Sequence, residues 1–114
     1  MHELPITQSI LNIALSEAKK NNAAKVTKIK IALGVMCGMV PECIQEYFNL
    51  ISEDTIAYKA ELVFRKIPVT FRCAECGEEF SCDRIRFRCD KCGSNRVKML
   101  SGREFYVESI DIED

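Results

Sequence analysis

Apolar side chains recur at helical spacing at the start of the chain. Intervals of three and four residues place them on one face of a helix. The stripe consists of Ile6, Ile10, Leu11, Ile13, Ala14, Leu15 and Ala18. Pro5 fits the first turn of this helix, where its missing N–H is not needed. Lys19 and Asn22 fit the end, because cations favour the negative end of the helix dipole and asparagine tolerates a left-handed cap. We therefore expect an amphipathic core helix.

A second helical pattern follows Pro41. Pro41 and Glu42 suit the first turn of a helix. Four apolar residues then follow the spacing i, i+3, i+4, i+7: Ile44, Tyr47, Phe48 and Ile51. We expect this face to pack into the core. Cys43 borders it and is expected to be a small buried hydrophobe.

A period of two predicts strands in other segments. In residues 24–33, Ile29 and Ile31 alternate with lysines, which is typical of a half-buried strand. Residues 60–69 form a second predicted strand. Its alternation slips near Arg65, which predicts a bulge or a bend there.

A third strand is predicted over residues 105–112. Its alternation is ambiguous, since it places Phe105 and Val107 on one face and Ile110 and Ile112 on the other. The predicted order is helix, strand, helix, strand, an inserted segment, and a final strand. This order predicts one α/β unit that is interrupted by a second module.

The inserted segment contains two Cys-x-x-Cys-Gly sequences. Cys73 and Cys76 form the first pair and Cys89 and Cys92 the second, with twelve residues between the pairs. Each pair fits a tight turn that ends on a glycine, the residue that adopts positive φ freely. Sulfurs in such turns converge on one ion at about 2.3 Å. The spacing predicts a closed, structural zinc site.

The zinc module divides the predicted chain into residues 1–69 plus 100–114 and residues 70–99. A segment this short cannot bury a core of its own, so the metal must supply folding energy. A disulfide pairing is disfavoured because nothing in the sequence is typical of a secreted chain, and a redox Cys-x-x-Cys usually occurs once. An iron site with the same four ligands stays open as an alternative.

Composition narrows the possible functions. Net charge is −1 over 114 residues, and the segment from Phe71 to Met99 has seven basic and five acidic residues before the −2 of a zinc tetrathiolate is added. We therefore expect no nucleic-acid partner. The longest apolar run is too short for a membrane helix, and Met1-His2-Glu3 lacks the basic start of a signal peptide. These features predict a cytoplasmic protein without a membrane partner.

The N-terminus carries a second candidate metal site. The Met1 amine, the His2 amide and the His2 imidazole can chelate one ion through a five- and a six-membered ring. Three nitrogens in a plane suit Ni²⁺ or Cu²⁺, and Glu3 can supply a fourth ligand. His2 is the only histidine in the chain, and the predicted zinc site is closed, so we expect no enzyme activity.

Several motifs occur in an order that resembles the HypA/HybF family of nickel-insertion proteins for [NiFe]-hydrogenase. They are Met1-His2-Glu3, Gly34 with Val40-Pro41-Glu42, Thr55-Ile56-Ala57, Ala60-Glu61-Leu62, both cysteine pairs, Gly93-Ser94, Gly102 with Glu104, and Ser109-Ile110-Asp111-Ile112-Glu113. The resemblance covers essentially the whole chain. It implies an α+β fold in which two helices pack on a small three-stranded mixed sheet, with an inserted zinc-ribbon-like four-cysteine domain.

The resemblance also implies a function and partners. His2 would be the principal nickel ligand, aided by the Met1 amine and by Glu3, while the four cysteines would hold zinc. The protein would be a metallochaperone that delivers Ni(II) to the large subunit of a hydrogenase with the GTPase HypB. Urease maturation proteins are a further expected partner. The chain would be a monomer or a weak or domain-swapped homodimer.

Two departures from the family pattern bear on the nickel ligands. Some relatives place an acidic ligand at the position of Val40, and valine cannot bind a metal. Cys37 stands nearby in the sequence and is an alternative soft ligand. Cys82 lies inside the zinc module, but its spacing fits neither pair.

A second class of function stays open. The chain could instead be a zinc-ribbon module that binds a protein or nucleic acid and ignores nickel. The position of the single histidine favours the metallochaperone. Nickel binding that depends on His2 would discriminate between the two.

Overall fold

The computed structural model describes residues 3–82 and 88–114. The chain divides into two compact units. The helical unit contains Met1–Ile31, Gly38–Arg65 and Tyr106–Asp114, and the cysteine unit contains Ala32–Cys37 and Lys66–Phe105. Each is therefore assembled from separate stretches of the chain. No helix in the described part of the chain combines the length and apolar content needed to cross a membrane.

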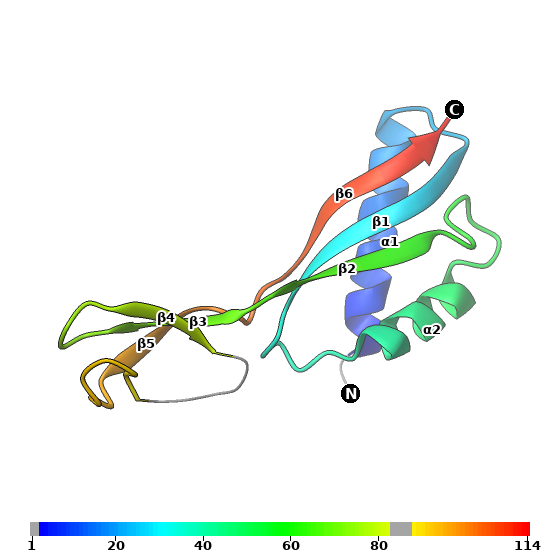
Figure 1. Ribbon diagram of the computed structural model, residues 1–114. Coiled ribbons are helices and arrows are strands. Elements are labelled where there is room, and N and C mark those ends of the chain that lie inside the picture. The colour runs from blue at the N-terminus through cyan, green and yellow to red at the C-terminus, as the bar shows by residue number, and fades with distance from the viewer. Residues whose placement is uncertain (1–2, 83–87) are drawn as a thin grey trace. The chain divides into compact units, whose positions relative to one another are not determined.

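Helix α1 (Glu3–Lys20) confirms the first predicted helix (Figure 1). It starts two residues before Pro5, and Asn22 adopts the expected left-handed conformation, with φ of 52°, after its end. The buried face consists of Glu3, Thr7, Ile10, Leu11, Ala14 and Ala18. Ile13 was expected in this stripe but is 45% exposed. The face that packs into the core is therefore narrower than the apolar stripe.

Helix α2 (Pro41–Ile51) confirms the second predicted helix. Ile44 and Phe48, four residues apart, are fully buried. Tyr47 was expected beside them but is 38% exposed, and Cys43 is half-buried rather than buried. Only the central line of the apolar face enters the core. Tyr47 and Cys43 lie at its borders.

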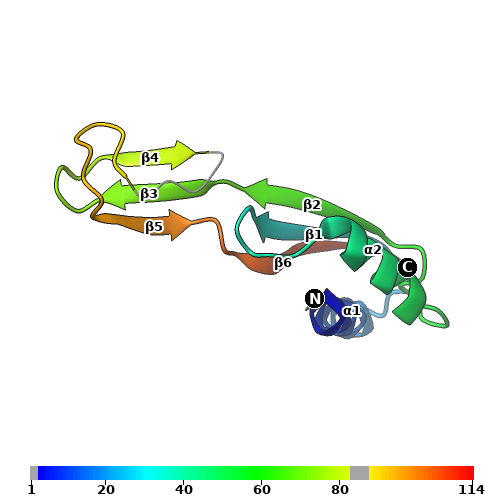
Figure 2. The same cartoon turned by 90° about the horizontal axis from the view of Figure 1, so that it is seen from below.

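Three strands form the first sheet: β1 (Lys25–Gly34), β2 (Glu61–Ile67) and β6 (Phe105–Glu113), in the order β2-β1-β6. The arrows of β1 and β2 point the same way in Figure 2. β6 runs antiparallel to β1, because Ala24 N–H donates to Glu113 C=O and Gly34 N–H donates to Glu104 C=O. Both helices cover the same face of this sheet. The predicted three-stranded mixed sheet is thus confirmed.

The predicted facing of β6 was wrong. Val107, Ile110 and Ile112 are all half-buried, as residues on one face of the strand are expected to be. Glu108 and Ser109, between them, are both exposed. Two consecutive exposed residues interrupt the simple alternation, and the apolar residues on either side return to the same face.

The cysteine unit contains a second three-stranded sheet that the periodicity did not predict. It consists of β3 (Val69–Cys73), β4 (Glu79–Cys82) and β5 (Val97–Ser101), in the antiparallel order β4-β3-β5. The predicted strand over residues 60–69 corresponds to β2, which ends before Pro68, and β3 begins after this proline, which has no N–H to donate to a sheet. Phe71 is fully buried, and its ring stacks on Phe80 at 5.6 Å.

Gly34 and Gly102 touch backbone to backbone within the cysteine unit. A Cβ on Gly34 would lie 2.3 Å from both the carbonyl carbon and the oxygen of Gly102. Beside this contact, Met36 N–H donates to Gly102 C=O and Val35 N–H donates to Ile67 C=O. Gly34 ends β1 as predicted, and the reason is this close approach.

Candidate metal centres

The four paired cysteines come together at the end of the cysteine unit. Sulfurs of Cys73, Cys76, Cys89 and Cys92 all lie within 4.8 Å of one another. The Sγ atoms of Cys73 and Cys92 are 3.5 Å apart, and those of Cys76 and Cys89 are 3.6 Å apart. Sulfurs at the corners of a tetrahedron around Zn²⁺, each about 2.3 Å from the ion, would be about 3.8 Å apart. The four thiols therefore fit a tetrahedral zinc ion.

The two Cys-x-x-Cys turns have matching backbone geometry. Gly77 N–H donates to Cys73 C=O at 2.9 Å, and Gly93 N–H donates to Cys89 C=O at the same distance. The two glycines have φ of 77° and 75°. Each turn closes with a second bond: Cys73 N–H to Glu78 C=O at 2.9 Å, and Cys89 N–H to Ser94 C=O at 2.7 Å. The predicted turns are two copies of one sulfur-presenting loop.

Backbone N–H groups point at the sulfurs of these loops. The Cys76 N–H, followed by other donors, lowers the pKa of Cys73 to about 6. The Ser94 N–H favours the Cys92 thiolate, but hydrogen bonding to Cys73 and burial together raise the pKa of Cys92 to about 12. Without a cation, the Cys73 thiol therefore ionises before the Cys92 thiol. A bound divalent ion supplies the charge that lets all four sulfurs ionise.

Burial closes one side of the cluster. Cys73 and Cys89 are 1% and 2% exposed, while Cys76 and Cys92 lie at the surface. All four positions of a tetrahedral ion would be occupied by protein sulfur. Such a site holds two loops together and leaves no coordination position for a substrate.

Ion pairs link the two loops on the surface. Arg96 pairs with Glu75 at 3.0 Å, and Lys91 lies 3.9 Å from Glu78. Each pair joins a residue in or after one cysteine loop to a residue in or after the other. All four side chains are about half exposed or more, so these pairs contribute little stability beside the metal.

The predicted nickel ligands are described only in part. Met1 and His2 lie outside the described residues. Glu3 is 5% exposed, and its Oε2 accepts a hydrogen bond of 3.2 Å from the Val40 N–H. The Thr7 hydroxyl donates to the Glu3 carbonyl oxygen. The third residue of the chain is therefore packed into the start of α1.

The hydrogen bond between Glu3 and Val40 was not predicted from the sequence. It joins positions 37 residues apart, and no local sequence pattern indicates such a contact. Cys37 is half-buried after a turn in which its N–H donates to Gly34 C=O. Cys82 ends β4, but its side chain lies outside the described residues.

Comparison with known sequences gives one family. Residues 1–112 match the family model described as "Hydrogenase/urease nickel incorporation, metallochaperone, hypA". A hydrogenase maturation factor HypA from Caldanaerobacter subterraneus subsp. tengcongensis is 39% identical over 114 residues, which cover 99% of this chain and 100% of that protein. HypA from Aquifex aeolicus is 34% identical over 113 residues, covering 99% of this chain and 98% of the relative.

Solved structures show the same fold. A solution structure of HypA protein has a TM-score of 0.74 at 24% identity and covers 98% of this chain and 96% of its own. The solution structure of the Ni metallochaperone HypA from Helicobacter pylori has a TM-score of 0.67 at 24% identity, with coverage of 99% and 98%. The family match over nearly the whole chain, the relatives above and the four-cysteine cluster agree: this chain belongs to the HypA family of nickel metallochaperones for hydrogenase maturation.

Proposed function

We propose that this protein binds one Ni(II) ion at its N-terminus and delivers it for the maturation of a [NiFe]-hydrogenase. The ligands are the Met1 amine, the His2 amide and imidazole, and Glu3. The four cysteines hold a structural zinc ion. Nickel passes to the hydrogenase large subunit with the help of the GTPase HypB, and urease maturation proteins are a second outlet. The protein transfers a metal and catalyses no reaction.

One observation carries the nickel proposal. The family match begins at Met1 and so includes the Met1-His2-Glu3 start, which contains the only histidine of the chain. The packing of Glu3 adds support. Because Glu3 is tied to Val40 at the first turn of α1, its backbone enters the chelate from a fixed point. Fixing one end of a chelating segment lowers the entropy lost when the metal binds.

The chemistry of the ligands suits a carrier rather than a permanent site. Binding through the His2 amide requires loss of its proton, so nickel uptake releases protons. Return of a proton to that nitrogen weakens the chelate. Transfer therefore needs an acceptor with stronger ligands.

Calorimetric titration of zinc-loaded protein with Ni²⁺ tests the proposal. The parent with its native Met1 should bind one ion, and His2→Ala should lose this binding. A version with residues added before Met1 should also lose it if the α-amine is a ligand. The matched control is His2→Ala combined with Gln8→His, which restores an imidazole on the exposed side of α1 and should not restore binding.

Metal content after dialysis completes the test. We expect His2→Ala to retain one zinc ion per chain, because the cysteine cluster is untouched. Equal nickel affinity in His2→Ala and the parent would contradict nickel binding through His2, on which the metallochaperone proposal rests. The alternative, a zinc-ribbon interaction module without nickel, would then lead.

Cys37 and the oligomeric state each need a separate measurement. Cys37→Ser should leave nickel affinity unchanged if the N-terminal residues suffice, and a lower affinity would assign this thiol as a soft ligand. Sedimentation of the zinc-loaded protein distinguishes a monomer from the weak or domain-swapped homodimer.

A further inference from the structure

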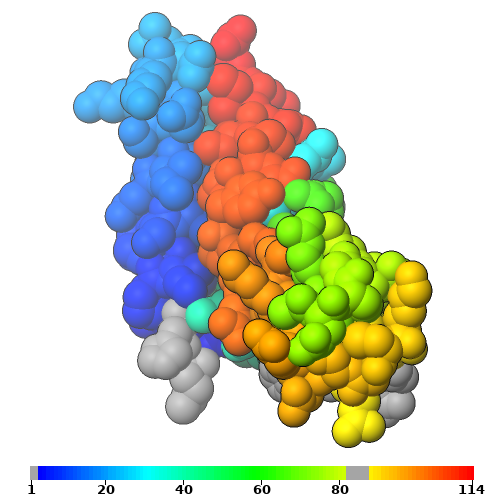
Figure 3. All heavy atoms as spheres, turned by 90° about the vertical axis from the view of Figure 1, so that its left-hand side faces the viewer, coloured from blue at the N-terminus to red at the C-terminus, as the bar shows by residue number. Residues whose placement is uncertain are grey.

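A groove runs between α1 and β6 of the helical unit. Its volume is about 340 Å³, and eight residues line it: Ile13, Glu17, Asn21, Val107, Glu108, Ser109, Ile110 and Ile112. Figure 3 shows the two elements side by side at the surface, α1 in blue and β6 in orange to red. The groove is separate from both metal centres in the sequence and uses none of their ligands.

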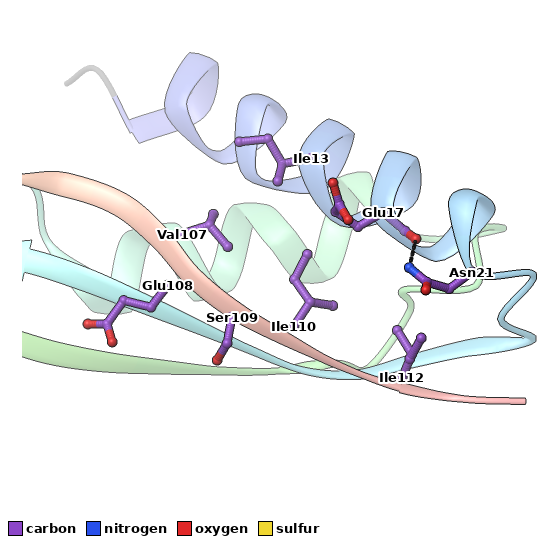
Figure 4. A pocket seen from close by; sticks show the side chains of 8 residues that line it. All are labelled: Ile13, Glu17, Asn21, Val107, Glu108, Ser109, Ile110 and Ile112. Atoms are coloured by element: carbon purple, nitrogen blue, oxygen red, sulfur yellow. Dashed lines mark hydrogen bonds between the residues drawn. The ribbon is translucent and has the colours of Figure 1, made fainter.

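Two rows of side chains form its walls. Ile13, Glu17 and Asn21 follow one another four residues apart on α1, and the Asn21 amide donates to the Glu17 backbone carbonyl. Val107, Ile110 and Ile112 form the opposite row on β6 (Figure 4). Two carboxylates line the groove: that of Glu108 pairs with Arg65, and that of Glu17 lies on the α1 wall opposite these apolar side chains. This combination suits a lysine or arginine, whose methylenes pack on isoleucine while the charged end pairs with the acid.

β6 lies at the edge of its sheet. In the described sheet order β2-β1-β6, only one side of β6 is paired. The outer side presents backbone N–H and C=O groups along a strand of nine residues. Such an edge accepts an added strand, whose backbone supplies affinity and whose alternate side chains supply specificity.

The charges along this edge are acidic. Glu108, Asp111 and Glu113 lie on β6, and Glu17 faces it from α1. Arg65 pairs with Glu108, and Lys20 lies 3.4 Å from Glu17 on the open surface. No residue that lines the groove is basic. Pairing β6 with β6 of a second copy would set these acidic side chains against one another, which disfavours a homodimer through this edge.

We propose that β6 and this groove bind an extended segment of a partner protein, in which apolar residues alternate with lysine or arginine. The segment adds as a strand to the free edge of β6. Its cationic side chains enter the groove, where their methylenes lie on Val107, Ile110 and Ile112 and one charged end pairs with Glu17. This docking surface is independent of nickel binding at the N-terminus.

Binding of a labelled model peptide tests the proposal on the zinc-loaded, full-length protein. The probe is a short, acetylated and amidated peptide of alternating valine and lysine. Its controls have the same composition in two blocks, glutamate in place of lysine, or N-methyl groups along one backbone edge. Fluorescence anisotropy gives affinity, and amide chemical shifts locate the contact. The alternating peptide should bind most tightly and shift the signals of β6 and of the second half of α1.

Variants assign the two walls of the groove. Glu17→Gln should weaken the lysine peptide by about two- to fivefold, which is the range for a partly exposed ion pair. Ile110→Lys should weaken it by about tenfold or more, because apolar burial is replaced by a like charge. The matched control, Glu42→Gln, removes an exposed acid on α2 and should leave the affinity unchanged.

Three outcomes would overturn the proposal. The first is equal binding of the alternating and block peptides. The second is a set of shifted amides that leaves out β6, a result that does not depend on how well any variant folds. The third is a dimer of the protein alone that Ile110→Lys dissociates, since this would assign the edge to a second copy.

Discussion

The helical unit and the cysteine unit are stabilised in different ways. Among the described residues, the helical unit buries twelve apolar side chains from two helices and a sheet, including Ile10, Ile29, Ile44 and Phe48. The cysteine unit buries six, and two of these are Cys73 and Cys89 of the four-cysteine cluster. One unit has an ordinary hydrophobic core. The other has only a few buried side chains around Phe71, and a core this small needs a cross-link such as a metal ion bound by the four cysteines would supply.

The difference shows what a metal ion bound by the four cysteines would replace. Apolar burial needs elements long enough to cover one another, as α1 and α2 cover the sheet. The strands β3, β4 and β5 have five, four and five residues. Two loops of a few residues can be fixed by four sulfurs around one ion, because the bonds to the ion are strong and directional. A short segment thus becomes ordered without a large core.

Removal of zinc should have the largest effect and should act on one unit only. A structural zinc site contributes about 10–16 kcal/mol of binding energy to folding. Cys73→Ser, or a strong chelator, should therefore abolish the order of the cysteine unit. The amide spectrum of the helical unit should keep its dispersion. Ala74→Ser, in the same loop but with no ligand changed, should retain zinc. Collapse of both spectra together would show that the units do not fold separately.

Truncation of a core side chain in the helical unit should destabilise that unit and leave the cysteine unit intact. Phe48 is fully buried, and Phe48→Ala should cost about 3–5 kcal/mol of unfolding free energy. Zinc content and the cysteine-unit spectrum should stay unchanged. Tyr47→Ala, at the neighbouring exposed position, is the matched control and should cost clearly less. Chemical denaturation followed by helix circular dichroism measures both.

A methyl group on Gly34 should destabilise the cysteine unit without touching its metal. The added Cβ would meet backbone atoms of Gly102 at 2.3 Å, and backbone cannot move aside as a flexible side chain does. Overpacking of this kind costs about 1–3 kcal/mol. The control is Gly38→Ala, whose Cβ meets nothing within 4 Å but which has a φ of 81°. It should report backbone strain alone, about 1–2 kcal/mol. A neutral Gly34→Ala would contradict the backbone contact.

Surface charge should have the smallest effect. Arg96 and Glu75 join the two cysteine loops, with 71% and 49% of their side chains exposed. Arg96→Gln should change the unfolding free energy by less than about 1 kcal/mol, and less still at high salt. Thermal unfolding of the zinc form at low and high salt provides the measurement. A large loss would mean that the charge pair carries part of the work assigned to zinc.

Local sequence patterns predicted the elements that are specified by a large apolar face or by the spacing of cysteine pairs. The two helices, the mixed sheet and the four clustered cysteines follow from Ile10 and Ala14, from Ile29 and Ile31, and from the two Cys-x-x-Cys pairs. Strands β3, β4 and β5 were not predicted. These strands become buried by pairing with one another. That pairing brings together residues from separate strands, such as Phe71 and Phe80, and leaves no periodic signal along the sequence.

The same reasoning explains the errors at Tyr47 and β6. Periodicity indicates which residues share a face of a helix or strand. How much of that face is buried depends on the size and position of the element that packs against it. Tyr47 lies beyond the part of α2 that packs inward, and Glu108 and Ser109 interrupt the alternation of β6. The link from Glu3 to Val40 depends on two segments that meet only in the folded chain. Such long-range contacts leave no periodic signal.

Insertion of the cysteine unit before β6 has a consequence for the speed of folding. About forty residues separate the end of β2 from the start of β6, and closing a loop of that length costs roughly 3 kcal/mol of chain entropy. Within the cysteine unit, Thr70 pairs with Ser101 across β3 and β5. Once zinc has ordered this unit, the two chain ends leave it side by side. The loop that remains to be closed is then shorter, and the entropy cost of closing it falls by about 1.5 kcal/mol. Zinc binding should therefore accelerate completion of the helical unit, by up to about tenfold if β6 pairs in the transition state.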